Sequence, residues 1–347
     1  MELRIFHGPV NISGFAGKLS SWQRKQGAIS DTITKTGNIY DPPGDINLDL
    51  YKYNFISRYI IILLFFFFCL FRYNVFNFYF GLSLLPLNLD LPILRLFGKK
   101  IIMTYCGSDI RLIGLEKKRN PYWQLLHFGL NNPKYDRIKK IKMHWHRLWV
   151  HKVIAPKSAF AHAAQVFPDN MIIRDIIPHH QMDMNVFIPE SYTTKTVPVV
   201  LHAPSKTDIK GTTYVEEILS ELKNEGYEFE YCKLHKVPYH VVHETIRNKA
   251  DIILDQFLLG TFGHFAVEGM YYGKPVVASL IESVKQELYP DCPIVSASID
   301  TLKEKLIWLI QNPQERIRLV KEGRAFVEKN YDQEKINEHI WNLYHRI

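Results

Sequence analysis

ADIILDQFLLGTFGHFAVEGMYYGKPVVAS, residues 250–279, has the pattern of one strand–loop–helix–strand unit. Residues 251–257 form an apolar, β-branched run of strand length, and residues 265–272 have helical apolar spacing. Residues 276–278 form a second short apolar run. In a parallel sheet such a unit brings the amino end of its helix to the carboxyl edge of the strands. Unpaired backbone N–H groups there favour an anion such as a diphosphate.

Glycines and one acidic residue punctuate this unit. Gly260 and Gly263 mark a turn, and Gly273 stands where the helix should end. Glu268 lies in the second turn, and helical side chains lean toward the amino end of their helix. We therefore expect its carboxylate to face the loop and accept hydrogen bonds from paired sugar hydroxyls. The alternative is an acid that only stabilises the start of the helix.

The same helix and the residues after it carry a longer motif, Glu-x-Met-x-x-Gly-Lys-Pro-Val. Its members are Glu268, Met270, Gly273, Lys274, Pro275 and Val276. The run resembles the nucleotide-sugar site of the family 4 glycosyltransferases, retaining enzymes of the GT-B fold. In that family a further glutamate touches the donor sugar, and this chain has Gly260 at its position. Sugar recognition would then fall to the backbone N–H groups of Phe262, Gly263 and His264 and to the His264 side chain.

Three further loops match the resemblance. After a strand expected at residues 3–6, Ser13, Gly14 and Gly17 stand where the family places a glycine loop under the donor phosphates. The alternative is a plain strand-to-helix turn.

A second loop follows another strand. There Cys106 occupies the place of a family histidine, and we expect it to line the site. Asp109 is expected to form hydrogen bonds there, or to cap a turn.

The third loop follows the first strand of the second half. The family supplies an arginine and a lysine to the diphosphate from this segment. Lys210 matches the lysine, and Lys206 or Ser205 stands near the place of the arginine. Two cations opposite a helix amino end would stabilise a leaving diphosphate, whereas the alternative for Lys210 is an exposed lysine at a helix start.

Composition sets wider bounds. The 347 residues exceed what one core usually serves, and the formal net charge of +8 suits an anionic partner. Four scattered cysteines predict neither disulfides nor a zinc site, and the start of the chain does not look like a signal peptide. We expect a cytoplasmic protein without a bound metal or cofactor. Nucleic acid is not an expected partner, because no recognition module accompanies the basic residues.

Two segments raise the question of a membrane. Residues 59–71 are strongly apolar, but this run is shorter than the span of a bilayer. A buried helix on the face of a sheet is the expected structure, with insertion into a membrane interface as the alternative. Residues 117–157 combine many cations with Trp123, Trp145 and Trp149, which predicts a solvated helix face or attachment to an anionic membrane, on its inner side.

Strand and helix patterns alternate in both halves of the chain, which favours parallel sheets covered on both faces. The resemblance implies two Rossmann-like domains facing a central cleft. We expect an acceptor-side domain at 1–180, a nucleotide-sugar domain at 195–325, and a helix at 326–347 that crosses back to the first domain. The connection at 178–198 is the expected boundary.

The resemblance implies a metal-independent glycosyltransferase. It would move a sugar from a nucleoside diphosphate to a glycan, lipid-linked or other acceptor with retention, in polysaccharide or glycoconjugate synthesis. Lys210, Glu268, Cys106 and Asp109 are the expected catalytic residues. Two alternatives remain open because of Gly260 and Cys106: an inactive nucleotide-sugar-binding partner of another transferase, and a nucleotide-sugar epimerase of the same fold.

Overall fold

The computed structural model describes residues 2–35, 43–126, 132, 134–173 and 195–347. The chain divides into two compact units. Unit 1 comprises Met1–Leu112, Lys134–Gln181 and Glu334–Ile347, and unit 2 comprises Ile113–Pro133 and Met182–Gln333. The units are thus interleaved in sequence, while the predicted ranges 1–180, 195–325 and 326–347 stay predictions. Most of the expected boundary at 178–198 lies outside the described residues.

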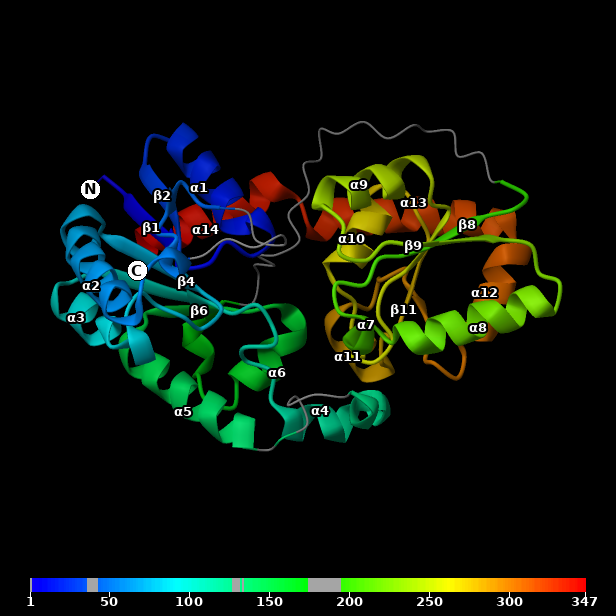
Figure 1. Ribbon diagram of the computed structural model, residues 1–347, viewed down its shortest axis with the longest axis horizontal. Coiled ribbons are helices and arrows are strands. Elements are labelled where there is room, and N and C mark those ends of the chain that lie inside the picture. The colour runs from blue at the N-terminus through cyan, green and yellow to red at the C-terminus, as the bar shows by residue number, and fades with distance from the viewer. Residues whose placement is uncertain (1, 36–42, 127–131, 133, 174–194) are drawn as a thin grey trace. The chain divides into compact units, whose positions relative to one another are not determined.

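Unit 1 is built on a parallel sheet of seven strands in the order β3-β2-β1-β4-β5-β6-β7 (Figure 1). Side chains alternate between its two faces, as the strand period requires. Phe6 and Phe76 enter one core cluster and Ile5 and Val75 the other. The strands are β1 Arg4–Gly8, β2 Ile29–Thr34, β3 Ile46–Asn47, β4 Val75–Tyr79, β5 Lys100–Thr104, β6 Lys152–Ile154 and β7 Ile172–Ile173.

Helices cover both faces of this sheet (Figure 1). α1 (Phe15–Lys25) and α14 (Gln333–Arg346) share one face, where the Trp22 Nε1–H donates to Glu334 Oε1 at 2.8 Å. The other face carries α2, α3 and α5. Their bounds, with the shorter α6, are α2 Phe55–Arg72, α3 Asp90–Leu96, α5 Lys134–Trp149 and α6 Phe160–Ala163.

The expectation that residues 59–71 form a buried helix is wrong in one respect. A helix is present and longer than the apolar run, because Asn54 caps it by accepting from the Ser57 N–H. It rests on the sheet through one stripe only: Ile62, Phe66, Cys69 and Leu70 are its buried residues. α2 is long and apolar enough, by length and composition, to cross a membrane, and only 22% of it is buried.

Unit 2 has a parallel five-stranded sheet in the order β12-β11-β10-β8-β9, so β10 is its central strand. One face is covered by α8 and α12, whose leucines pack on Val200, Ile252 and Leu254. On the other face α10 lies so close that a Cβ at Gly269 would approach Ile253 and Val276 to 3.0 Å. The strands are β8 Val199–His202, β9 Glu230–Lys233, β10 Ile252–Leu254, β11 Val276–Ala278 and β12 Val295–Ser296.

The helices of unit 2 confirm most of the pattern expected from the sequence. They are α4 Ile113–Arg119, α7 Thr207–Lys210, α8 Thr212–Asn224, α9 Tyr239–Asn248, α10 His264–Tyr271, α11 Glu282–Leu288, α12 Leu302–Gln311 and α13 Pro313–Asn330. The central unit is confirmed as strand, loop, helix and strand. The predicted fold class, α/β with two Rossmann-like parallel sheets, is therefore confirmed.

Candidate functional site

The loop that leaves the central strand of unit 2 is organised by Asp255. This residue directly follows β10 and is buried. One of its oxygens, Oδ1, accepts a hydrogen bond from Lys210 Nζ at 2.5 Å, and the other, Oδ2, accepts from the Gly263 N–H at 2.6 Å. A carboxylate at the carboxyl edge of the sheet thus fixes both the lysine and the residue that precedes α10.

Lys210 itself is held from its backbone side. It ends the short helix α7, where Gly211 has a φ of 75° that favours glycine. The Lys210 carbonyl accepts from the Phe257 N–H at 3.2 Å, which ties α7 to the loop after β10. Its side chain is only 12% exposed, so the ion pair with Asp255 is largely shielded from water.

His202 joins the carboxyl ends of β8 and β10, the strands that precede Lys210 and Asp255 in the chain. Its Nδ1–H donates to the Leu254 carbonyl at 2.9 Å, and its Nε2 accepts from the Thr212 hydroxyl at 2.9 Å. Burial lowers the pKa of His202 to about 4, so the ring is neutral and has one donor and one acceptor as these contacts require.

Glu268 lies at the centre of a second cluster, on α10. Its Oε1 accepts from the Tyr239 hydroxyl at 2.5 Å and lies 2.7 Å from His264 Nε2 and 3.1 Å from His243 Nε2. His264 and Glu268 are one turn apart on α10, whereas Tyr239 and His243 are one turn apart on α9. Two facing helices therefore converge on one carboxylate oxygen.

The electrostatics of this cluster keep Glu268 ionised. Burial raises the pKa of the carboxyl, but the attraction of His264 and His243, whose Nε2 atoms lie close to Oε1, outweighs this penalty and holds the pKa well below its usual range. Burial and the Glu268 charge raise the pKa of Tyr239, so its hydroxyl remains a donor. His243 is oriented in turn, because its Nδ1 lies 3.0 Å from the Tyr272 hydroxyl.

Gly260 occupies a position that admits no larger residue without rearrangement. Its φ is +68°, in the left-handed region. A Cβ there would lie 3.1 Å from Ile281 Cγ2 and 3.2 Å from Asn120 Nδ2. Asn120 is fixed because its Nδ2–H donates to the Leu258 carbonyl at 2.8 Å. The local backbone therefore accounts for the glycine at the position of the family glutamate.

The structure brings together four predicted residues of unit 2, namely Lys210, Gly263, His264 and Glu268. Gly260 lies instead against Ile281 and Asn120. Ser205 and Lys206 are exposed just before α7, whereas Asp255 bonds to Lys210 and Gly263. The Phe262 side chain packs on Tyr289, with ring centroids 4.8 Å apart. The Gly263 N–H, expected to bind sugar, donates to Asp255 instead.

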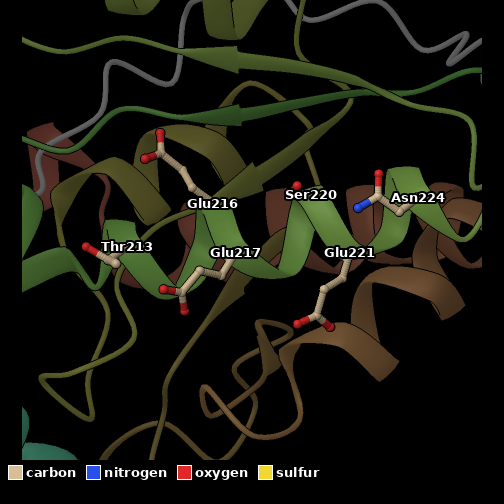
Figure 2. A pocket seen from close by; sticks show the side chains of 6 residues that line it. All are labelled: Thr213, Glu216, Glu217, Ser220, Glu221 and Asn224. Atoms are coloured by element: carbon tan, nitrogen blue, oxygen red, sulfur yellow. The ribbon is translucent and has the colours of Figure 1, made fainter.

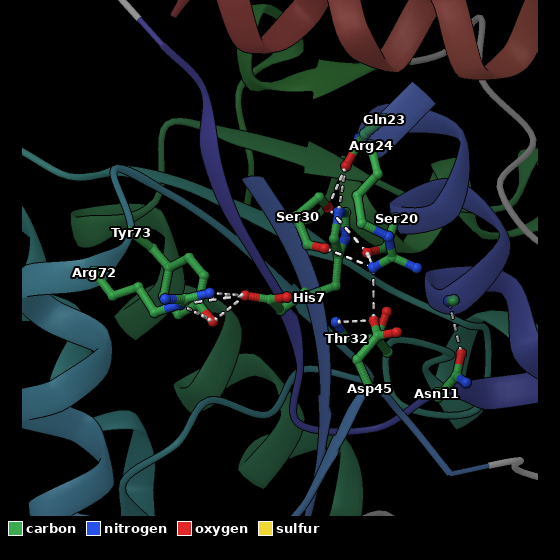
Figure 3. Close-up of polar contacts among 12 residues, drawn as sticks. His7, Asn11, Ser20, Gln23, Arg24, Ser30, Thr32, Asp45, Arg72 and Tyr73 are labelled. Carbon is green, nitrogen blue, oxygen red and sulfur yellow. Dashed lines mark hydrogen bonds and ion pairs between the residues drawn. The ribbon is translucent and has the colours of Figure 1, made fainter. Parts of the chain in front are cut away.

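In unit 1 the predicted glycine loop follows β1 as expected. Ser13 and Gly14 have positive φ values of 51° and 73°, and Gly14 precedes α1. The Gly17 N–H donates to Asn11 Oδ1 at 3.1 Å, an interaction drawn in Figure 3. The buried Asn11 thus closes the loop against the first turn of α1.

Asp109 shapes the loop after β5. Its Oδ1 accepts from the N–H groups of Cys106 and Gly107, at 3.0 and 2.8 Å. Burial raises its pKa to about 6, despite these hydrogen bonds. The contacts fit the turn-capping alternative, and Cys106 is half-buried beside it. Catalytic roles for either residue stay predictions.

A shallow hollow lies elsewhere on unit 2, along the outer face of α8. Figure 2 shows the polar side chains that line it, from Thr213 to Asn224. None of the candidate site residues belongs to it. Among the described residues, no group of three or more His, Cys, Asp or Glu side chains is arranged to hold a metal ion, and this includes the Glu268 cluster.

Sequence reasoning missed Asp255, Tyr239 and His243. Asp255 was placed inside an expected strand at 251–257, but β10 ends at Leu254 and leaves it at the sheet edge. A carboxylate at the carboxyl edge of a parallel sheet is the feature that could have identified Asp255 as a site residue. Tyr239 and His243 share one helical face, yet nothing local in the sequence connects them to Glu268.

Comparison with known proteins reveals similarity at the level of structure. No family model and no curated protein matches the chain. Sucrose-phosphate synthase from Thermosynechococcus elongatus is similar at a TM-score of 0.73 and 14% identity, over 100% of this chain and 99% of the other. HepE of Anabaena, in complex with UDP-glucose, is similar at 0.65 and 11%, over 100% of both chains. A putative UDP-N-acetylglucosamine 2-epimerase from Listeria monocytogenes follows at 0.56 and 9%, over 98% and 95%. At these identities the similarity establishes the fold, which is of the GT-B type.

Proposed function

We propose that this chain is a glycosyltransferase that moves a sugar from a nucleoside diphosphate to a glycan, lipid-linked or other acceptor, with retention of the anomeric configuration. The observation that carries the proposal is the convergence of Glu268, Lys210 and the amino end of α10 in a chain with the GT-B fold. Gly263 and His264 join the two clusters, because Gly263 bonds to the partner of Lys210 and His264 contacts Glu268.

In this proposal Glu268 binds the ribose of the donor. Tyr239, His243 and His264 hold its Oε1, which orients the carboxylate and keeps it charged. Its other oxygen, Oε2, would accept hydrogen bonds from ribose hydroxyls. A charged acceptor is stronger here than a neutral one, since charge-assisted hydrogen bonds are roughly twice as strong.

Lys210 and the start of α10 would bind the diphosphate. The ammonium group has donors beyond the one used by Asp255, and the helix start favours negative charge. Negative charge grows on the diphosphate as the bond to the sugar breaks, so these groups would stabilise the transition state more than the bound substrate. They would perform the task that a metal ion performs in other transferases.

The sugar would contact the loop at Gly260, where no carboxylate is present. Because the Gly263 N–H is already bonded to Asp255, the other expected donors to the sugar are the Phe262 and His264 N–H groups and the His264 side chain. Such a neutral site should discriminate poorly between sugars that differ at one hydroxyl. We place the reaction in the cytoplasm, in polysaccharide or glycoconjugate synthesis.

A donor screen tests this function. The purified chain is incubated with UDP-, GDP-, ADP- and dTDP-sugars and an acceptor mixture, and released nucleotide and products are identified by mass spectrometry. UDP-glucose is the first donor to test, because HepE binds it. Donor-dependent transfer that Lys210→Met removes supports the proposal. Nucleotide binding without turnover would favour the inactive-partner alternative suggested by Gly260, and sugar isomerisation without transfer would favour an epimerase.

A further inference from the structure

α2 presents an unusually large apolar surface for a helix that covers a sheet. Its exposed large apolar side chains are Phe55, Ile56, Tyr59, Ile60, Leu63, Leu64, Phe67, Phe68 and Phe71, each at least 45% exposed. Monomeric soluble proteins rarely expose contiguous apolar patches larger than roughly a few hundred Å². A surface of this kind indicates an interaction site rather than ordinary solvent contact.

The neighbouring helices on the same sheet face extend this surface. The ring of Phe71 contacts that of Phe97, just after α3, with centroids 6.4 Å apart. Phe97 is 56% exposed and the adjacent Leu96 is 83% exposed. α5 packs beside α3. The Trp145 Nε1–H of α5 donates to the carbonyl of Asn88, just before α3, at 3.0 Å. In Figure 1, α2, α3 and α5 lie along one side of the unit 1 sheet.

The outer face of α5 combines apolar and basic side chains. Ile138, Ile141 and Leu148 are 59%, 62% and 67% exposed. Arg137 and Lys140, which are next to Ile138 and Ile141 in the sequence, are exposed as well. Residues 50–72 and 91–108 contain no Asp or Glu at all. Apolar side chains with cations beside them and few acids match the chemistry of an anionic bilayer surface.

The topology favours insertion into the interface over a membrane span. β3 and β4, the strands before and after α2, run parallel in one sheet, so α2 is their crossover and both its ends stay with the sheet. Its buried stripe is part of the core of unit 1. A spanning helix would have to leave that core. A helix lying in the interface needs to bury its apolar face by only about 5–10 Å.

We propose that the exposed faces of α2 and α5, with residues 96 and 97 between them, form a membrane-binding surface for anionic lipid bilayers. The apolar side chains of α2 enter the headgroup–acyl boundary, and Arg137 and Lys140 of α5 contact lipid headgroups. A second copy of the chain and a membrane span are the competing explanations of the same apolar surface, and each gives a different result in the test.

The test measures binding of the full chain to vesicles by flotation. Vesicles of phosphatidylcholine alone are compared with vesicles of phosphatidylcholine mixed with phosphatidylglycerol. The protein should float with the mixed vesicles and bind the neutral ones far more weakly, and added salt should weaken binding to the mixed vesicles. Failure of the unmodified protein to float with the mixed vesicles would overturn the proposal.

Matched variants assign the binding to these helices. Ile60→Gln/Leu64→Gln/Phe67→Gln should lower the partition coefficient by about 100-fold, because apolar burial drives insertion. Ile60→Leu/Leu64→Ile/Phe67→Leu keeps the apolarity at the same positions and should retain binding. Circular dichroism of both variants verifies their folding, and equal binding by the two would contradict the proposal.

A second pair of variants tests the role of charge. Arg137→Gln/Lys140→Gln on α5 should lower binding to anionic vesicles by ~30-fold, at about 1 kcal/mol per cation near the surface. Lys18→Gln/Lys25→Gln removes the same charge from α1, on the other face of the sheet, and should leave binding unchanged. A dimer in analytical ultracentrifugation that the glutamine triple variant dissociates would overturn the proposal in favour of self-association. Resistance of the membrane-bound protein to alkaline carbonate extraction would overturn it in favour of a span.

Discussion

Replacing Glu268 should weaken nucleotide binding and also lower the free energy of unfolding. The structure allows these two effects to be estimated separately. Tyr239, His243 and His264 contact Oε1 in the free protein, so the loss of those contacts affects the free and bound states alike. That part of the cost appears in the free energy of unfolding. The part that remains in binding is the hydrogen bonding to ribose, about 1.5–3 kcal/mol for a charged acceptor.

Glu268→Ala should therefore raise the Kd for UDP by about 10- to 150-fold. Glu268→Gln keeps the volume and one acceptor oxygen, and we expect a smaller rise of about 3- to 10-fold. Glu217→Gln on α8 removes an exposed acid of the same unit outside the site and serves as the matched control. Tyr239→Phe removes one donor to Oε1 and should weaken binding only slightly.

Isothermal titration calorimetry with UDP measures these differences, with thermal unfolding as the test of fold. The stability cost also has a predicted pH dependence. The pKa of Glu268 is lowered on folding, so its contribution is present above the unfolded pKa of about 4.3 and is lost as pH falls toward the folded value. The stability difference between wild type and Glu268→Ala should shrink in that acid range. An unchanged Kd for UDP in a folded Glu268→Ala protein would refute the ribose-binding role.

Three further predictions concern the loops around this residue. Lys210→Met should lower kcat more than it raises KM. It should also destabilise the protein by about 3 kcal/mol, because the charge of Asp255 is left buried and unpaired. In chemical denaturation Lys210→Met/Asp255→Asn should regain much of that stability, and no gain would contradict the pairing. Gly260→Ala should cost about 2–3 kcal/mol of stability, against about 1 kcal/mol for Gly27→Ala, since both have positive φ but only Gly260 has close neighbours. Equal losses of stability in the two variants would show that Ile281 and Asn120 move aside for the added methyl group. Folding raises the pKa of Asp109 to about 6, so between pH 4 and 6 the folded state keeps a proton that the unfolded state has lost, and the free energy of unfolding should fall by up to about 3 kcal/mol over that range. Asp109→Asn should flatten this fall, measured as the denaturation midpoint at each pH. An unaltered slope would show that Asp109 is not its cause.

Much of the fold could be predicted because local patterns agree with the final packing. β11 has the predicted bounds, 276–278, and Gly273 and Pro275 separate it from the helix before it. β2 and β3 were not predicted. Four of the six residues in the run ISDTIT of β2 are polar. Its buried Ser30 gains partners from α1, since Ser30 Oγ–H donates to Gln23 Oε1 at 2.8 Å (Figure 3).

The burial of α2 could not be predicted for a different reason. An apolar run shows that a helix avoids water, but it does not show how much of its surface the sheet covers. Phe66 and Leu70 pack in the core while Leu64 and Phe71 are exposed, so only one face of the helix is covered by the rest of unit 1.

The candidate site shows the same division between local and distant information. Glu268 and Lys210 could be singled out from the sequence because both stand in segments that follow strands and resemble a family pattern. Their immediate partners come from elsewhere in the chain: Asp255 pairs with Lys210 across 45 positions, and Tyr239 reaches Glu268 across 29. No spacing rule connects such residues before the fold is known.

The most direct test of the central claim is the stereochemistry of a single turnover product. The purified chain, its best donor from the screen and an accepted acceptor are followed by nuclear magnetic resonance, which reports the anomeric configuration of the new bond as it forms. Our account predicts transfer from the nucleoside diphosphate sugar with the donor's anomeric configuration retained, and loss of this product in Lys210→Met. An inverted product, or release of free sugar and nucleotide at the same rate in wild type and Lys210→Met, would contradict it.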